Sequence, residues 1–98
     1  MNSTDSPYHV IPDDIEVAVA IYRYYLKGES ARFSKLVKDL DGRMSRDVIS
    51  KNIDQLFDLG IITGNWIKDD DGKWIRTFSI AVSEREFIRS IDEMRVKE

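Results

Sequence analysis

The sequence predicts a single α+β domain, mainly α-helical, with helices first, then a β-hairpin and a last helix. Apolar residues recur at helical spacing through residues 13–59. From residue 61 to 82 the pattern changes to strand-like stretches on either side of an acidic turn. A serine with a glutamate three residues later then begins a final amphipathic segment. At 98 residues the chain is long enough for one such domain and too short for two.

The first predicted element is a helix with two apolar sides. Residues 1–11 show no period and are expected to form a flexible N-terminal tail, which leaves residues 12–98 as the folded domain. We expect the helix to follow Pro12, with Asp13 as its cap and Glu16 completing a capping box. Because its apolar residues fall on two sides, it is either the central helix of the domain or half of a dimer seam. Gly28 is expected to end it.

Two further helices follow, separated by a turn at residues 41–44. The second helix is short and basic, with Arg32, Lys35 and Lys38 placed off a buried face that consists of Phe33, Leu36, Val37 and Leu40. Ser45 is the expected cap of the third helix, and Gly60 is its expected C-terminal stop. The buried stripe of the third helix is predicted to consist of Ile49, Ile53 and Leu56.

The hairpin strands are predicted at residues 61–68 and 73–82, joined through the acidic stretch that ends at Asp71-Gly72. Trp66 and Trp74 flank this loop, so we expect them to pair across it. Ser83 and Glu86 form a capping box that begins the last helix. The apolar side of that helix is predicted to consist of Phe87, Ile88, Ile91 and Met94.

A helix, a helix-turn-helix, a hairpin and a last helix make up the arrangement called a winged helix, a three-helix bundle with a β-hairpin wing and a C-terminal helix. The stretch ARFSKLVKDLDGRMSRDVISKNIDQLFDLGII resembles winged-helix transcription regulators of the HxlR and MarR type. The segment GKWIRTFSIAVSE is similar to their wing strand, and Arg76 matches the wing arginine of those regulators. The resemblance covers residues 30–86 and implies a regulator that binds double-stranded DNA sequence-specifically.

The distribution of charge is compatible with that function. The net charge is −3, which argues weakly against nucleic-acid binding. Residues 30–51 nevertheless contain six bases and three acids, a local net charge of +3, and they include the helix-turn-helix. The positive charge therefore lies where a DNA-binding surface is expected.

In a helix-turn-helix, the N-terminal residues of the second helix contact base edges in the major groove. Here that end presents Ser45, Arg46, Asp47, Ser50 and Lys51, which we predict to be the recognition residues. The residues predicted to contact the DNA backbone are Arg32, Lys35 and Arg43. The wing residues predicted to reach phosphates or a minor groove are Lys68, Lys73 and Arg76.

Three aspartates share the outer face of the third helix. Asp54 and Asp58 lie toward the end of the helix that points out of the groove, where their negative charge would weaken DNA binding little. Asp47 lies at the reading end, and three interpretations of it remain open. It accepts a hydrogen bond from cytosine, it pairs with Lys51 four residues later, or it marks a protein that does not bind DNA.

The composition disfavours several other classes of function. There is no cysteine and one histidine, His9, so no metal site or cofactor is expected, and no catalytic motif indicates an enzyme. Neither a secretory signal nor a membrane-spanning run is apparent, which favours the cytoplasm. A homodimer on a pseudo-palindromic site is expected, because one such domain makes few contacts with DNA. The alternative is a winged-helix module that binds protein instead of DNA.

Overall fold

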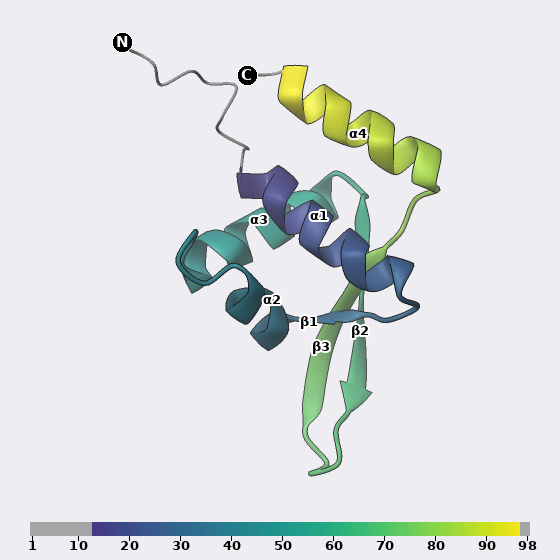
Figure 1. The fold of residues 1–98 in the computed structure, drawn as a ribbon. Helices are drawn as coiled ribbons and strands as arrows, with labels where there is room; N and C mark the ends of the chain where they lie inside the picture. The colour runs from purple at the N-terminus through teal and green to yellow at the C-terminus, as the bar shows by residue number, and fades with distance from the viewer. Residues whose placement is uncertain (1–12, 97–98) are drawn as a thin grey trace.

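The computed structural model describes residues 13–96, and its elements follow the predicted order with one addition (Figure 1). The helices are α1 (Asp13–Leu26), α2 (Phe33–Asp39), α3 (Arg46–Asp58) and α4 (Glu84–Val96). The hairpin consists of β2 (Ile62–Lys68) and β3 (Trp74–Ile80), and a short strand, β1 (Ala31–Arg32), precedes α2. The predicted tail at residues 1–11, His9 within it, and the side chain of the expected cap Asp13 lie outside the described part.

The hairpin belongs to a three-stranded antiparallel sheet in the order β1-β3-β2. β1 was not predicted, because two residues are too few to show a period. In this strand Arg32 pairs with Thr77 of β3 and has extended backbone angles, φ −94° and ψ 147°. The expectation that Arg32 lies on the second helix was therefore wrong, because the sheet extends to the residue at which α2 begins.

α1 lies at the centre of the core. Ile15, Val17, Ala18 and Ile21, from both of its apolar sides, are at most 2% exposed. They pack with buried residues from every other element, among them Ala31, Leu36, Ile49, Ile53, Leu56, Ile62, Phe78 and Phe87. Both apolar sides of α1 are thus buried within one chain, as expected if α1 is the central helix of the domain.

Both ends of α3 form as the sequence predicts. The hydroxyl oxygen of Ser45 accepts a hydrogen bond from the Val48 N–H at 3.3 Å, as an N-cap does. At the other end Gly60 has a φ of +75°, and the N–H groups of Gly60 and Ile61 donate to the carbonyls of Phe57 and Leu56. These two hydrogen bonds form the Schellman motif, after which the chain leaves the helix and enters β2.

The hairpin projects away from the helices and ends in the acidic turn (Figure 1). Asp69 organises this turn, because its Oδ1 accepts the N–H groups of Asp71 and Lys73, each at 2.9 Å. The Gly72 N–H donates to the Asp69 carbonyl at 3.0 Å. One of the three aspartates is therefore used to shape the loop, and Asp70 and Asp71 remain exposed.

α4 begins at the predicted cap, where the Ser83 hydroxyl accepts the Glu86 N–H at 3.2 Å. It packs on α1 through Phe87, whose ring stacks on Tyr22 with centroids 4.4 Å apart. Ile91 and Met94 are buried as predicted, but Ile88 is 51% exposed, because it lies at the edge of the apolar stripe. No helix in the described range is long and apolar enough to cross a membrane.

Candidate nucleic-acid interface

The N-terminal half of α3 presents a polar surface beside the turn that precedes it. Its buried stripe, Ile49, Ile53 and Leu56, is at most 3% exposed and holds one side of the helix against the core. The opposite side is open to solvent, and it carries all five predicted recognition residues, namely Ser45, Arg46, Asp47, Ser50 and Lys51. The helix therefore leaves these side chains available for an external partner.

Arg46 is exposed but has a partner within the domain. Its guanidinium carbon lies 5.4 Å from the centroid of the half-buried Phe33 ring at the start of α2. Such a cation–π contact restrains the side chain without neutralising its charge. Arg46 is thus held at the junction of α2 and α3 with its donors still able to reach a base or a phosphate.

Asp47 is not paired with Lys51. Between residues 15 and 94 the structure contains one salt bridge, which joins Arg43 to Glu16. The helical pairing considered for Asp47 is therefore absent, which leaves cytosine recognition or a loss of DNA binding. The Asp47 carboxylate would discriminate strongly among DNA sequences, because it can face a base edge only where that edge offers a hydrogen-bond donor.

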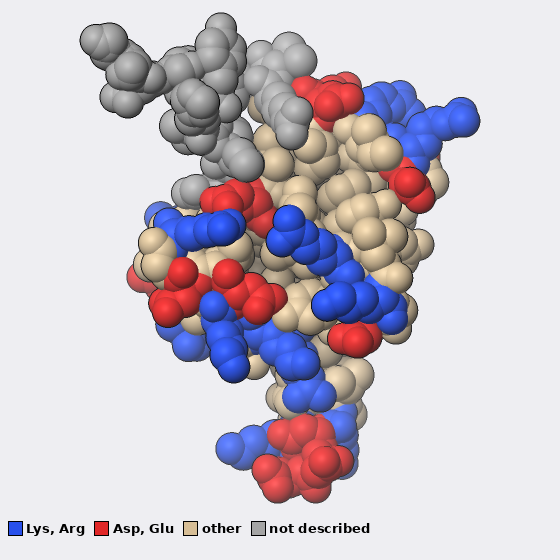
Figure 2. All heavy atoms as spheres, in the orientation of Figure 1, with Lys and Arg blue, Asp and Glu red and all other residues tan. Residues whose placement is uncertain are grey.

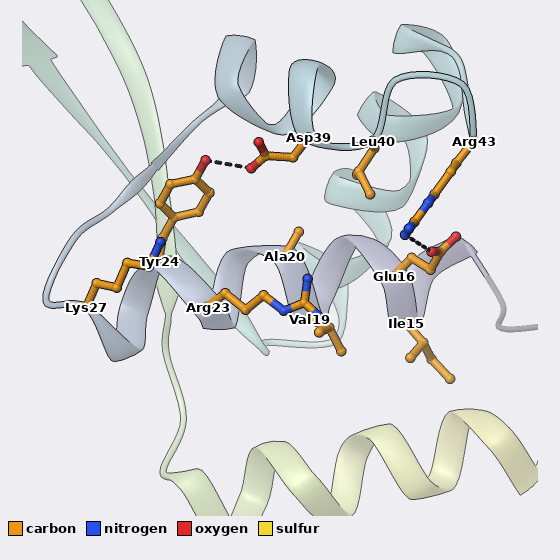
Figure 3. A pocket seen from close by; sticks show the side chains of 10 residues that line it. All are labelled: Ile15, Glu16, Val19, Ala20, Arg23, Tyr24, Lys27, Asp39, Leu40 and Arg43. Carbon is orange, nitrogen blue, oxygen red and sulfur yellow. Dashed lines mark hydrogen bonds and ion pairs between the residues drawn. The ribbon is translucent and has the colours of Figure 1, made fainter.

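Arg43 is directed toward α1. Its Nη1 donates to Oε1 of Glu16 at 2.9 Å, across the groove drawn in Figure 3. The predicted contact of Arg43 with the DNA backbone thus requires this pair to open. Fully exposed ion pairs contribute about 0–1 kcal/mol, and in this pair the Arg43 side chain is 64% exposed whereas that of Glu16 is 19% exposed.

Arg32 and Lys35 lie together beside the wing. With Glu29, Ser30, Asn65, Trp66, Ile67 and Thr77 they line a groove of about 580 Å³ between the start of α2 and the hairpin. Thr77 is the one buried polar residue in the described core, and its hydroxyl donates to the Asn65 carbonyl at 3.2 Å. The structure therefore brings two predicted backbone contacts next to the predicted wing.

Arg76 is stacked at the base of the wing. Its guanidinium carbon lies 4.9 Å from the Phe57 ring of α3 and 5.4 Å from the Phe78 ring of β3. The Phe57 ring in turn lies against Gly64, where an added Cβ would be 2.9 Å from the Phe57 Cζ. Gly64 thus allows the ring to approach the sheet, and this cluster joins the wing to the recognition helix.

The tip of the wing carries mixed charge. Lys68 and Lys73 flank the turn on either side, and both are exposed. Figure 2 shows acidic side chains gathered at the end of the hairpin, where the sequence places Asp69, Asp70 and Asp71. Because these acids repel phosphate, a phosphate contact at this end of the wing would have to use the flanking Lys68 and Lys73 and not the turn between them.

The two tryptophans do not pair as predicted. In the strand register Trp66 lies opposite Arg76, and Trp74 lies opposite Lys68. The rings are therefore diagonal neighbours and not a directly opposed pair, and each is 62% exposed. The prediction was wrong because it required Trp66 and Trp74 to be directly opposite each other, and the hairpin turn closes at a position that offsets them by two residues.

A second groove, not predicted from the sequence, lies between α1 and α2 (Figure 3). It has a volume of about 570 Å³. Across it the Tyr24 hydroxyl donates to Oδ2 of Asp39 at 2.6 Å, and this hydrogen bond raises the pKa of Tyr24 to about 12. Sequence reasoning missed it because Tyr24 and Asp39 lie on different helices, and neither position shows a pattern that joins them.

Helices α1 to α3, the three-stranded sheet with its projecting hairpin, and α4 together define a winged-helix fold. Among solved structures the chain is similar to Pex from Synechococcus sp. (strain PCC 7942), with a TM-score of 0.57. The match covers 84% of this chain and 82% of Pex at 23% sequence identity, and it confirms the predicted fold. No family model and no curated protein matches the chain.

Proposed function

We propose that this protein binds double-stranded DNA sequence-specifically as a small transcription regulator. The observation that carries the proposal is the solvent-facing N-terminal half of α3, with Arg46, Ser50 and Lys51 exposed opposite a fully buried stripe. The winged-helix fold, similar to that of a transcription regulator, supports it. Such a regulator would work in the cytoplasm, as the sequence predicts.

The recognition step would use α3 in the major groove. Arg46 and Lys51 would donate to guanine O6 and N7, and Asp47 would accept from cytosine N4. The capped N-terminus at Ser45 would add favourable dipole interactions with a phosphate. A correct base pair at each side-chain contact would contribute about 1–3 kcal/mol of discrimination.

The remaining basic residues would position the helix on the duplex. Arg32 and Lys35 lie beside the wing, and Lys68, Lys73 and Arg76 are the bases of the hairpin, on either side of its acidic turn. Contacts from lysine and arginine to phosphates fix register without reading sequence, and they make affinity depend on salt.

We further propose that the protein acts as a homodimer, because one domain of this size makes few contacts with DNA. Figure 2 shows a largely uncharged surface between α4 and the end of α1. On these two helices Tyr25, Leu26 and Ile88 are 43%, 62% and 51% exposed. This surface is the candidate dimer interface.

The test separates base reading from phosphate contact. A duplex selected from a random-sequence pool and an unrelated duplex would be titrated by fluorescence anisotropy at several salt concentrations. Arg46→Ala should lower affinity for the selected duplex by about 5–150-fold, the equivalent of about 1–3 kcal/mol, and change the unrelated duplex little. Lys73→Ala should weaken both duplexes alike and reduce the salt slope by about one.

Arg89→Ala is the matched control, because Arg89 is an exposed base on α4, away from the proposed surface. Its affinities should equal those of the unchanged protein. An Arg46→Ala protein that binds the selected duplex as tightly as the unchanged protein would show that α3 does not read bases through this residue.

A further inference from the structure

The wing carries an exposed aromatic and basic surface that the proposed α3 contacts do not use. Side chains alternate between the two faces of a strand, and the register pairs Trp66 with Arg76 and Lys68 with Trp74. These four residues therefore lie on one face of the hairpin, which we call the tryptophan face. Both tryptophans of the chain belong to it.

The two indole rings are largely exposed. Each is 62% exposed, and neither stacks on another aromatic ring among the described residues. The Lys68 ammonium lies 5.3 Å from the centroid of Trp74, which places a cation against one ring. Two large apolar rings exposed on one face forfeit the stabilisation that burial would give, and such patches mark contact surfaces.

The tryptophan face continues from the side of the wing that meets α3. Arg76 belongs to this face, and its guanidinium stacks on Phe57 of α3. Gly64, on the same face closer to the helices, contacts the same ring. A ligand that lies along α3 and passes the base of the wing would therefore meet Arg76 first and then Trp66.

Charge and aromaticity together favour a nucleobase as the occupant. Surfaces that bind bases without reading their edges combine aromatic rings for stacking with cations that follow the phosphates. The tryptophan face supplies two rings, Lys68 and Arg76, whereas the aspartates at the tip repel phosphate. A strand of DNA would thus be held across this face and not around the end of the hairpin.

We propose that Trp66 and Trp74 stack on unpaired or unstacked bases of DNA beside the site that α3 contacts. The inference rests on the proposed function and adds a class of substrate to it, namely a duplex that is locally opened or kinked next to the recognition site. Tryptophan side chains would take the place of the lost base stacking, which is the role of wedging side chains in DNA that is bent on binding.

The experiment uses two labelled duplexes of the same mixed sequence, one fully paired and one with a short bulge. Anisotropy of the label reports binding, and tryptophan emission reports stacking directly, since both tryptophans lie on the wing. We expect emission to be quenched on binding, and the bulged duplex to bind roughly tenfold or more tightly than the paired one. Trp66→Leu and Trp74→Leu should each remove most of that preference.

Two controls make the test specific. Trp66→Phe retains a ring and should retain most of the preference. Thr63→Ala changes the opposite face of the same strand at an exposed position outside the groove that Arg32 and Lys35 line, and should leave the preference unchanged. All of these side chains are exposed, so the variants should fold as the unchanged protein does.

The outcomes separate this inference from the proposed function. Binding of both duplexes with unquenched tryptophans and no bulge preference would overturn the stacking proposal and leave DNA binding intact. Absence of any anisotropy change at low salt would overturn both. A blue shift of the emission with protein concentration alone would assign the tryptophan face to contact between copies of the chain, which also overturns the proposal.

Discussion

Gly64 offers the sharpest test of how the wing is attached to α3. Replacing it with alanine would place a Cβ 2.9 Å from the Phe57 Cζ, closer than carbon atoms pack, with the Arg76 Nε 3.5 Å away. The Phe57 ring must therefore shift, and Arg76 stacks on that ring. Overpacking of this kind costs about 1–3 kcal/mol. For a domain of this size each kcal/mol lowers Tm by roughly 4–8 °C.

Circular dichroism during urea or thermal unfolding is the suitable assay, because Trp66 and Trp74 are already 62% exposed and their emission would change little on unfolding. The control is Gly64→Ala in a Phe57→Ala background. With the ring removed, alanine in the strand should be neutral or stabilising by about 0.5–1 kcal/mol, so the two substitutions should show strong coupling. If Gly64→Ala is equally neutral in the unchanged protein, the Phe57 ring does not pack against Gly64 of β2.

Three further expectations follow from individual contacts. Ser45→Ala should lower the free energy of unfolding by about 1 kcal/mol through loss of the α3 cap. Ser45→Asp should keep the cap yet weaken DNA binding, and equal loss of stability in both variants would contradict the capping role. Leu26→Glu should shift sedimentation toward monomer, provided the unchanged protein sediments as a dimer. A dimer of equal stability in the variant would exclude this surface. Tyr24→Phe should remove the tyrosine that titrates near pH 12, measured by tyrosinate absorbance. Because hydrogen bonding raises the Tyr24 pKa above its ordinary value of 10.0, the stability from that bond is fully present below pH 10 and is lost as pH rises toward 12. If the absorbance step near pH 12 remained in the variant, Tyr24 would not be the tyrosine that titrates there.

The helices and their ends were predictable because each depends on neighbours in sequence. Ser45 begins α3 and Gly60 ends it through bonds that span only a few residues. The stripe of Ile49, Ile53 and Leu56 follows from helical geometry alone, so the outward side of α3 could be predicted together with it.

Features that depend on register or on contacts between elements were not predictable from the sequence. The pairing of Trp66 with Arg76 depends on where the hairpin turn closes, and a shift of the turn would change every cross-strand partner. The salt bridge between Arg43 and Glu16 joins residues far apart in the chain. The contact of Phe57 with Gly64 depends on how closely α3 approaches the sheet, which no periodicity encodes.

The most direct test of the central claim is a backbone-amide NMR titration of the labelled protein with a mixed-sequence duplex at low salt. Even non-specific binding registers under these conditions, because phosphate contacts dominate affinity. DNA binding predicts shifts concentrated at residues 32–35, 43–51 and 68–76 that fade as salt is added. An unchanged spectrum would contradict DNA binding and favour a winged-helix module that binds protein.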